Sequence, residues 1–244
     1  MQSDLRLSIW SGPRNISTAM MRAWGNRQDT LVFDEPLYAH YLRETGKPHP
    51  GAQEVIAAGP ADAAEAIARM LAPPPVGKQI CYHKQMAHHL LPQLPRDWMR
   101  RMTHAFLIRD PREVIASYLK HVAEPALEDT GYPQQLEIFR LVRGWTRKIP
   151  PVVDARDVLT DPRAVLTRLC ESLGVDFSER MLSWPPGGRE TDGVWAKYWY
   201  KEVEKTTSFG KYEDKPRVIP PHLRGLLDEC QSYYRELYQH RLKA

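Results

Sequence analysis

The sequence predicts a single α/β domain with a central parallel sheet of about five strands and helices on both faces. Strand-like runs alternate with helix-like runs along all 244 residues, an order typical of βαβ units. No segment of about 20–50 residues repeats, so solenoids and propellers are excluded. Most of the 21 prolines stand at the joints between the runs and not in one linker, so we expect one domain over residues 1–244.

Five short apolar runs bounded by polar or proline residues are predicted as strands: residues 5–10, 30–33, 79–83, 104–108 and 151–155. Between them, helices are expected at residues 17–26, 61–71, 111 to about 121, 134–148 and 162–173. The helix at 61–71 has Ala64, Ile67, Ala68 and Leu71 at helical spacing. Pro111 and Pro162 open two of the helices, since proline is favoured in a first turn.

The last third of the chain is less regular. Residues 125–133 are predicted as a loop. Residues 184–217 are rich in Trp, Tyr, Gly and Lys and are predicted to be irregular, in the manner of a lid. Residues 221–242 are expected to form a closing helix.

Composition narrows the class of protein. The formal net charge is +4, from 34 Lys and Arg against 30 Asp and Glu, too weak to indicate nucleic acid but suited to a small anion where cations converge. No apolar run approaches about 18 residues, so no membrane span is expected. Cys81, Cys170 and Cys230 are too few and too far apart for a disulfide framework or a zinc site. With no signal-type apolar segment near the N-terminus, we expect a cytoplasmic protein.

The loop after the first strand is the first candidate site. It runs through Pro13 and Arg14 to Ser17 and Thr18, where the next helix begins. A helix N-terminus offers unpaired N–H groups and a positive dipole end, and Arg14 adds a forked cation suited to oxyanions. An N-cap beside an ordinary surface arginine is the structural alternative. Neither G-x-x-x-x-G-K-[ST] nor G-x-G-x-x-G occurs, which disfavours a standard ATPase or dinucleotide enzyme.

A second candidate site follows the fourth predicted strand. Arg109 ends that strand, Asp110-Pro111 begins the helix, and Ser117 lies two turns into it. Carboxyl ends of parallel strands share one crevice, so Arg109 is expected near the first loop. The alternative is that Arg109 pairs with Asp110 or Asp157 and that Ser117 only packs.

Together these segments resemble the PAPS-dependent sulfotransferases, where PAPS is 3′-phosphoadenosine 5′-phosphosulfate. The family's first loop reads P-[KR]-S-G-[ST]-T, and residues 13–18 match it except at Asn15 and Ile16. Its second signature is a strand-ending Arg, then D-P, then a Ser eight residues after the Arg, as in Arg109 to Ser117. Residues 157–175 are similar to a third family segment, so the resemblance spans about residues 5–175.

The resemblance implies a nucleotide-kinase-like or sulfotransferase-like fold and a transfer of the sulfuryl group from PAPS to a hydroxyl or amine of a small molecule. It further implies that the 5′-phosphosulfate is held by the loop residues Arg14, Asn15, Ile16, Ser17 and Thr18. Arg109 and Ser117 would hold the 3′-phosphate, and Arg14 would stabilise charge on the leaving oxygen. No metal is expected.

The resemblance leaves the general base open. Ile16 stands in place of the loop glycine, and Met86 stands where cytosolic members have a catalytic His, although Lys84 matches their Lys. Glu35, after the second strand, is the first candidate, with a turn before a helix as its structural alternative. His88 is second, and His40 and His83 follow. A zinc site from His83, His88 and His89 is disfavoured because no fourth ligand is nearby.

The predicted lid adds aromatic rings and cations. Trp195, Tyr198, Trp199 and Tyr200 stand among Lys197, Lys201, Lys205 and Lys211. They suit an adenine or an acceptor pocket, or equally a packed edge with solvated lysines. One short cluster does not indicate single-stranded nucleic acid.

Two rival functions remain open. One is a nucleotide or nucleoside kinase without a standard Walker motif. The other is a relative of the same fold that binds a nucleotide or a partner without catalysis, suggested by Ile16 and Met86. The sequence identifies neither the acceptor nor the oligomeric state.

Overall fold

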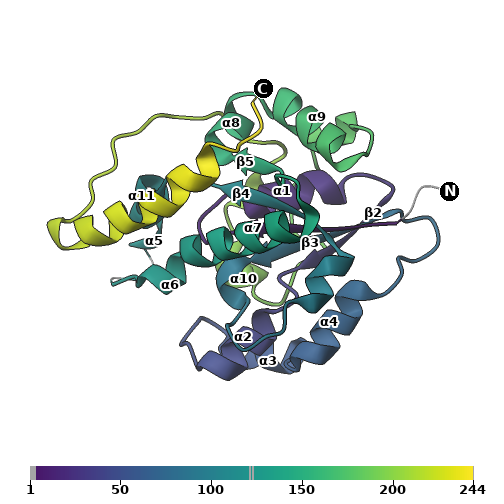
Figure 1. Cartoon of the computed structure of the whole chain (residues 1–244), viewed down its shortest axis with the longest axis horizontal. Coiled ribbons are helices and arrows are strands. Elements are labelled where there is room, and N and C mark those ends of the chain that lie inside the picture. Colours follow the sequence, from purple (N-terminus) through teal and green to yellow (C-terminus); the bar gives the residue numbers. More distant parts are fainter. Residues whose placement is uncertain (1–3, 121, 123, 244) are drawn as a thin grey trace.

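The computed structural model describes residues 4–120, 122 and 124–243. Five parallel strands form one sheet in the order β2-β3-β1-β4-β5, flanked by helices as Figure 1 shows. This confirms the expected single α/β domain. The strands are β1 (Leu5–Ser11), β2 (Thr30–Asp34), β3 (Ile80–Met86), β4 (Thr103–Ile108) and β5 (Val152–Asp154).

Strand β3 is longer than predicted, because it continues past His83 to Met86. It pairs with β1 along its whole length, with Leu5 opposite Ile80 and Ser11 opposite Met86. Every residue of β3 is buried, including Lys84 and Gln85. The polar residues that suggested a strand end are therefore part of an interior strand between β1 and β2.

The expected helices form close to their predicted positions, as α1 (Ser17–Gly25), α4 (Ala63–Leu71), α5 (Pro111–Tyr118), α7 (Tyr132–Thr146) and α9 (Pro162–Leu173). Proline lies in the first turn of α5, α7 and α9, where its missing N–H costs nothing. The expected end of α5, at about residue 121, lies outside the described residues. Helices α3 (Ala52–Ala58) and α8 (Ala155–Thr160) were not predicted, and α2 (Tyr38–Thr45) was considered only as the structural alternative for Glu35. The loop predicted at residues 125–133 is wrong, because α6 (Leu127–Thr130) and the start of α7 lie within it.

Short turns of 3-10 helix connect several elements: η1 (Ala87–His89), η2 (Asp97–Arg101), η3 (Glu179–Leu182), η4 (Val203–Lys205) and η5 (Pro221–Leu223). Within residues 184–217, only α10 (Ala196–Trp199) and η4 are helical among the described elements. Residues 211–220 then cross to the last helix as an extended segment, yellow-green in Figure 1.

The closing helix was predicted too long. Helix α11 covers Arg224–Tyr238, not residues 221–242. Beyond it, the Leu242 backbone N–H donates to the Val152 carbonyl over 2.8 Å, and Arg241 forms a bridge with Val152. The chain end therefore lies along the open edge of β5, which offers backbone hydrogen bonds that a longer helix would forgo.

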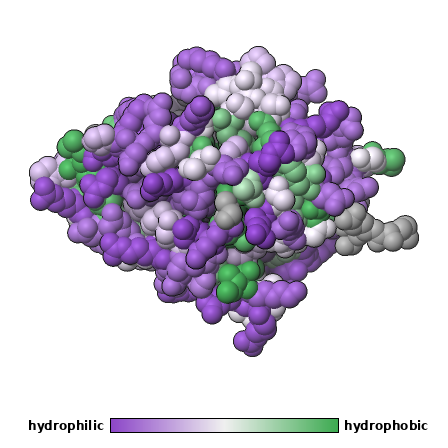
Figure 2. Space-filling model, turned by 90° about the horizontal axis from the view of Figure 1, so that it is seen from above, coloured by the Kyte–Doolittle hydropathy of each residue, from purple (hydrophilic) through white to green (hydrophobic). Residues whose placement is uncertain are grey.

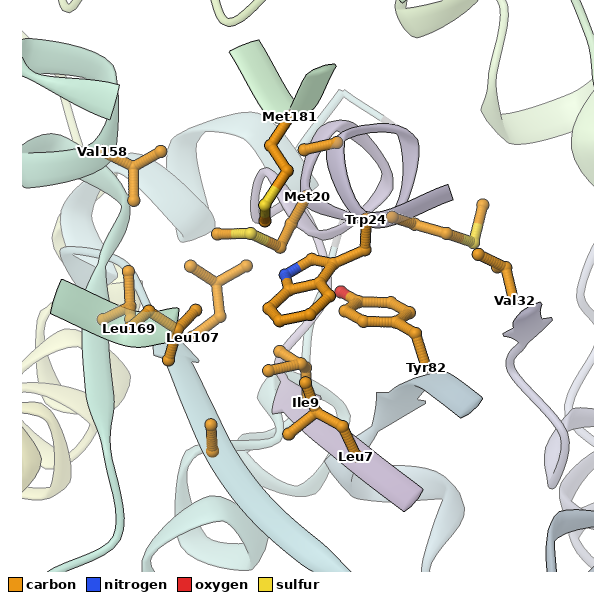
Figure 3. Close-up of a cluster of buried hydrophobic side chains, with 14 of the residues drawn as sticks. Leu7, Ile9, Met20, Trp24, Val32, Tyr82, Leu107, Val158, Leu169 and Met181 are labelled. Atoms are coloured by element: carbon orange, nitrogen blue, oxygen red, sulfur yellow. The ribbon is translucent and has the colours of Figure 1, made fainter. Parts of the chain in front are cut away.

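Each face of the sheet has its own hydrophobic cluster, because side chains alternate along a strand. Leu7 and Ile9 point to one face, where Trp24 of α1 stacks on Tyr82 with ring centroids 5.6 Å apart; Figure 3 shows this cluster. Trp10 and Phe106 point to the other face, against α4, α7 and α11. Both faces of the sheet are thus covered, which leaves the carboxyl ends of the strands as the accessible edge.

The surface is mainly hydrophilic on the face seen in Figure 2, with small hydrophobic patches. Cys81, Cys170 and Cys230 are buried free thiols. None of the helices in the described part of the chain is long and apolar enough to span a membrane.

Candidate active site

A cavity of about 680 Å³ lies at the carboxyl ends of the strands. Strand β1 is central, and the chain extends the sheet in opposite directions from it, so the loop after β1 lies at a switch point where α/β proteins bind ligands. The structure brings the main predicted site residues to this one cavity, but not the lower-ranked candidates His40 and His83. The residues it brings together are Arg14, Asn15, Ile16, Ser17, Thr18, Glu35, Lys84, His88, Arg109 and Ser117.

The loop between β1 and α1 accommodates Ile16 without strain. Ile16 has an ordinary φ of −85°, whereas Arg14 has the left-handed φ of 54°. The substitution of the family's glycine by Ile16 therefore does not force an unfavourable backbone. Gly12 is the glycine this loop needs, because a Cβ there would lie 2.4 Å from the Thr130 carbonyl oxygen.

Asn15 braces the loop from within. Its side-chain amide donates to the Leu107 carbonyl over 2.9 Å, and its Oδ1 accepts from the Ile16 backbone N–H over 2.8 Å. The Ile16 N–H is thus already paired. The N–H groups of Ser17, Thr18 and Ala19, at the start of α1 beside the cavity, have no helical acceptors, whereas the Met20 N–H donates to the Ile16 carbonyl over 2.9 Å.

Arg14, Arg109 and Ser117 form one cluster. Arg14 Nε donates to Ser117 Oγ over 3.1 Å, and Arg109 Nη1 donates to the Arg14 carbonyl over 2.9 Å. Burial and the nearby charge of Arg109 lower the pKa of Arg14. Across the described ranges, Arg14 makes no ion pair with a carboxylate. Two convergent guanidinium groups and a hydroxyl are a suitable site for an anion.

Arg109 does not pair with Asp110 or Asp157, the partners of the structural alternative. Its Nε donates to Glu113 Oε2 over 2.7 Å, while Asp157 pairs with Arg241 at 3.0 Å. Tyr212 of the extended segment donates to the other Glu113 oxygen over 3.0 Å. Glu113 thus holds Arg109 beside the first loop.

Lys84 lies between two carboxylates at the other end of the cavity. Its Nζ is 3.0 Å from Asp34 Oδ1, donates to Glu35 Oε1, and donates to the Tyr200 hydroxyl over 2.6 Å. Burial opposes the charge of Lys84, but Asp34 and Glu35 keep its pKa well above the ordinary value. Burial raises the pKa of Glu35; Lys84 opposes this rise and Asp34 adds to it.

The candidate histidines differ in position. His88 lines the cavity, and burial lowers its pKa to about 3. His89 also lines it and is stacked between Tyr38 and Tyr41, with ring centroids 4.7 and 4.6 Å away. His83 stacks on Phe33 with centroids 4.6 Å apart, and His40 contacts the Ala61 carbonyl at 3.1 Å. Neither of these two is among the described cavity-lining residues.

The C-terminal segment forms one wall of the cavity. Tyr198, Trp199, Tyr200 and Lys201 line it, and Thr206, Ser208 and Gly210 continue the wall. Lys205, by contrast, pairs with Glu202 at the surface, at 2.8 Å. Within the described residues, no group of three or more His, Cys, Asp and Glu side chains is arranged to hold a metal ion.

The sequence analysis missed Asp34 and the part played by Tyr200. Asp34 directly precedes Glu35 at the end of β2, so its position at the strand end was the available signal. Tyr200 pairs with Lys84, 116 positions earlier, and nothing in the local sequence around Tyr200 indicates that contact. Tyr38 and His49, hydrogen-bonded over 2.8 Å, also line the cavity and were not predicted.

Comparisons with known proteins show what the chain resembles in sequence and in fold. Residues 5–237 match the family model of the sulfotransferase domain. The chain is 34% identical over 232 residues to "Branched-chain-amino-acid aminotransferase-like protein 1" and 32% identical over 235 residues to "Branched-chain-amino-acid aminotransferase-like protein 2", both of Arabidopsis thaliana. The alignments cover 95% and 96% of this chain but 41% of each relative. The chain thus spans less than half the length of these relatives.

Solved structures share the fold at low sequence identity. They include a sulfotransferase from Alicyclobacillus acidocaldarius (TM-score 0.57, 11% identity, 98% of both chains covered). A sulfotransferase domain of the Synechococcus PCC 7002 olefin synthase has a TM-score of 0.53 at 19% identity, over 96% of this chain and 95% of the other. A sulfotransferase domain of the curacin biosynthetic pathway has a TM-score of 0.52 at 15% identity, over 96% and 98%.

Proposed function

Because the chain belongs to the sulfotransferase domain family, we propose that it transfers a sulfuryl group from PAPS to a hydroxyl or amine of a small-molecule acceptor. One observation carries the proposal: a single cavity has the Arg14–Arg109–Ser117 cluster at one end and the Glu35–Lys84 pair at the other. An anion site and a candidate base thus face the same space.

The cationic end fits a doubly anionic nucleotide. Arg14 is partly buried and forms no ion pair with a carboxylate of the described residues, and Arg109 and Ser117 lie beside it. The N-terminal N–H groups of α1 border the same space. We assign the 3′-phosphate to Arg109 and Ser117, and the 5′-phosphosulfate to the first loop with Arg14. PAPS would supply an activated sulfuryl group whose leaving group is a phosphate.

Glu35 is the proposed base. Its carboxylate takes the proton of the acceptor hydroxyl while the hydroxyl oxygen bonds to sulfur and the bond from sulfur to the phosphate oxygen breaks. The electron pair of that bond stays on the phosphate, and Arg14 stabilises the charge that develops there. Lys84, beside Glu35, stabilises the sulfuryl oxygens in the same step. A raised pKa brings Glu35 closer to the range of an effective base.

His88 is the weaker candidate base. It lines the cavity, but burial lowers its pKa to about 3, so it holds a proton poorly near neutral pH. His40 and His83 lie away from the described cavity lining and are not proposed.

Binding without catalysis is the second candidate function. The ion pair of Lys84 with Glu35 favours it, because each group satisfies the other's charge. Met86, in place of the family's His, also supplies no base. Under this alternative the cavity binds nucleotide at its cationic end and leaves the sulfuryl group in place.

Calorimetric titration with 3′,5′-diphosphoadenosine (PAP), the desulfated product of PAPS, tests the donor end. AMP and ADP are the controls, because each lacks the 3′-phosphate. We expect tight binding of PAP and weak binding of both controls. Equal affinity for all three would overturn the assignment of Arg109 and Ser117.

Substitution of Glu35 tests the catalytic end. Glu35→Gln is expected to bind PAP like the unmodified protein and to lose turnover of PAPS with a panel of neutral alcohols, phenols and amines. Turnover of the unmodified protein should fall as pH drops through the raised pKa of Glu35, because a protonated carboxyl accepts no proton. The control is Glu202→Gln, a cavity-lining glutamate at the surface. PAP binding without turnover of any acceptor would favour the second candidate function.

A further inference from the structure

Two neighbouring carboxylates share Lys84, but they face different parts of the molecule. Glu35 lines the cavity with 11% of its side chain exposed, whereas the side chain of Asp34 is 1% exposed. Asp34 is not among the described residues that line the cavity. Only Glu35 is therefore in a position to contact a molecule bound there.

Asp34 is satisfied by three donors from two distant parts of the chain. Lys84 Nζ lies 3.0 Å from its Oδ1, the Tyr200 hydroxyl is 2.8 Å from both carboxylate oxygens, and the Gly193 backbone N–H donates over 3.1 Å. Tyr200 in turn accepts from Lys84 over 2.6 Å. Both oxygens of this buried carboxylate therefore accept hydrogen bonds, which fix its position beside Lys84.

The same contacts fix residues 193–200 against the sheet. Gly193 and Tyr200 begin and end this segment, and both bind Asp34. Directly before it, Asp192 forms a two-point ion pair with Arg22 of α1, with contacts of 2.5 and 2.6 Å and both side chains buried. This part of the predicted lid is thus anchored at buried sites next to Lys84.

We propose that Asp34 is a positioning residue, which holds Lys84 from the side away from the cavity, anchors residues 193–200 at the same point, and leaves Glu35 as the carboxylate that exchanges a proton with the cavity. The catalytic meaning of this inference rests on the proposed function. The anchoring and the charge relation between the two acids do not.

The charge relation has a measurable consequence. The titratable groups facing Glu35 are Asp34 of β2, Lys84 of β3, Tyr38 of α2, His89 of η1 and Tyr200 after α10. Apart from Glu35 itself, Asp34 is the only carboxylate in this described set. Neutralising Asp34 removes a negative charge that raises the pKa of Glu35 and leaves the positive charge of Lys84, which lowers it. The pKa of Glu35 should therefore fall.

The first experiment measures the titration of Glu35 by carbon NMR in protein labelled at the glutamate carboxyl carbons, with Glu35→Gln identifying its signal. Asp34→Asn is expected to lower the Glu35 midpoint by about one pH unit or more. Tyr200→Phe keeps both charges and should leave the midpoint nearly unchanged. An unchanged midpoint in Asp34→Asn would overturn the proposed charge relation.

The second experiment measures backbone hydrogen exchange of residues 193–200 by mass spectrometry. An asparagine side chain has one acceptor oxygen in place of two, so it cannot accept from Lys84, Tyr200 and Gly193 as Asp34 does. Asp34→Asn should therefore speed exchange about tenfold or more. Tyr200→Phe should speed it as well. Glu35→Gln is the matched control, since it removes the other partner of Lys84 and leaves both anchors intact. Equal exchange in all four proteins would overturn the anchoring role.

Neither measurement requires turnover, so a failure of this inference can be distinguished from a failure of the proposed function. Where the unmodified protein does turn over PAPS, the acid limb of its pH profile should shift to lower pH in Asp34→Asn, with PAP affinity unchanged. A fall in turnover with no shift of that limb would reduce Asp34 to a structural residue and overturn the proposal.

Discussion

Arg14 and Glu35 have left-handed backbones, with φ of 54° and 42°. Such a conformation costs a non-glycine residue roughly 1–2 kcal/mol. The fold maintains it through the bond from Arg109 to the Arg14 carbonyl, and through the Glu35 N–H, which donates to the Lys84 carbonyl over 3.0 Å. Both residues line the cavity, and backbone strain of this kind is typical of functional positions.

Arg109→Ala is expected to weaken PAP binding by about 1.5–3 kcal/mol, because it removes a charged donor from the anion cluster. Calorimetric titration measures the change. Arg112→Ala is the matched control, since Arg112 is exposed in the first turn of α5, three residues after Arg109. Equal affinity in the two variants would remove Arg109 from the donor site.

At the residue scale, the sequence predicted the cavity well where a residue's position follows from a strand end. Arg14, Glu35 and Arg109 all follow strands, and parallel strands share one carboxyl edge. It did not predict the left-handed Arg14, because that conformation depends on Arg109, some 95 residues later. The end of β2 could have indicated Asp34, but its role could not be predicted, because its partners Gly193 and Tyr200 come from the far end of the chain.

Among the elements, α11 is attached to the sheet through a buried acid. The Tyr234 hydroxyl donates to Asp154 Oδ2 over 2.8 Å, and Asp154 also caps α8 by accepting from the Arg156 N–H over 2.8 Å. No cation among the described residues pairs with Asp154, and burial raises its pKa to about 6. The junction of β5, α8 and α11 therefore contains a carboxyl group that is protonated more readily than usual.

Stability should therefore depend on pH at this junction. The folded protein binds the Asp154 proton more tightly than the unfolded chain, so this stabilisation is complete below about pH 4 and is lost as pH rises through 6. Asp154→Asn should reduce the fall in unfolding free energy between pH 4 and 7 by about 2 kcal/mol. Urea unfolding at several pH values measures it.

Tyr234→Phe should have the opposite effect on the pH dependence of stability. The Tyr234 hydroxyl stabilises the charged carboxylate, so removing it should raise the pKa of Asp154 further and steepen the loss of stability with pH. Identical pH dependence in both variants and the unmodified protein would show that Asp154 does not titrate differently in the folded state.

Element boundaries were predictable from proline and strand patterns, but tertiary pairing decided the exceptions. Strand β3 continued through His83, Lys84 and Gln85 because β1 and β2 pair with it on both sides. Helix α11 ended early because the chain end pairs with β5. Neither outcome is encoded in the local sequence alone.

For the whole molecule, the cavity joins parts of the chain from Pro13 to Gly210. A ligand held there contacts segments that are far apart in sequence, so it should stabilise the fold as one unit. At a PAP concentration of about 100 Kd, the free energy of unfolding should rise by about 2.7 kcal/mol. Urea unfolding with and without PAP measures this increase.

Arg109→Ala at the same PAP concentration is the control, and it should show a smaller increase because its affinity is lower. AMP at that concentration should give little change. Equal stabilisation by PAP and AMP would contradict a site for the 3′-phosphate.

The strand order has a consequence for how such proteins diverge. Glu35 follows β2 and Lys84 lies in β3, on one side of β1, whereas Arg109 follows β4 and Ser117 lies in α5, on the other. The two pairs thus belong to opposite sides of the sheet, and Arg14, which contacts Ser117 and Arg109, follows the central strand β1. Under the proposed function, substitutions on one side of β1 would alter the acceptor site without touching the donor site, so relatives of this fold could change one partner of the reaction while keeping the other.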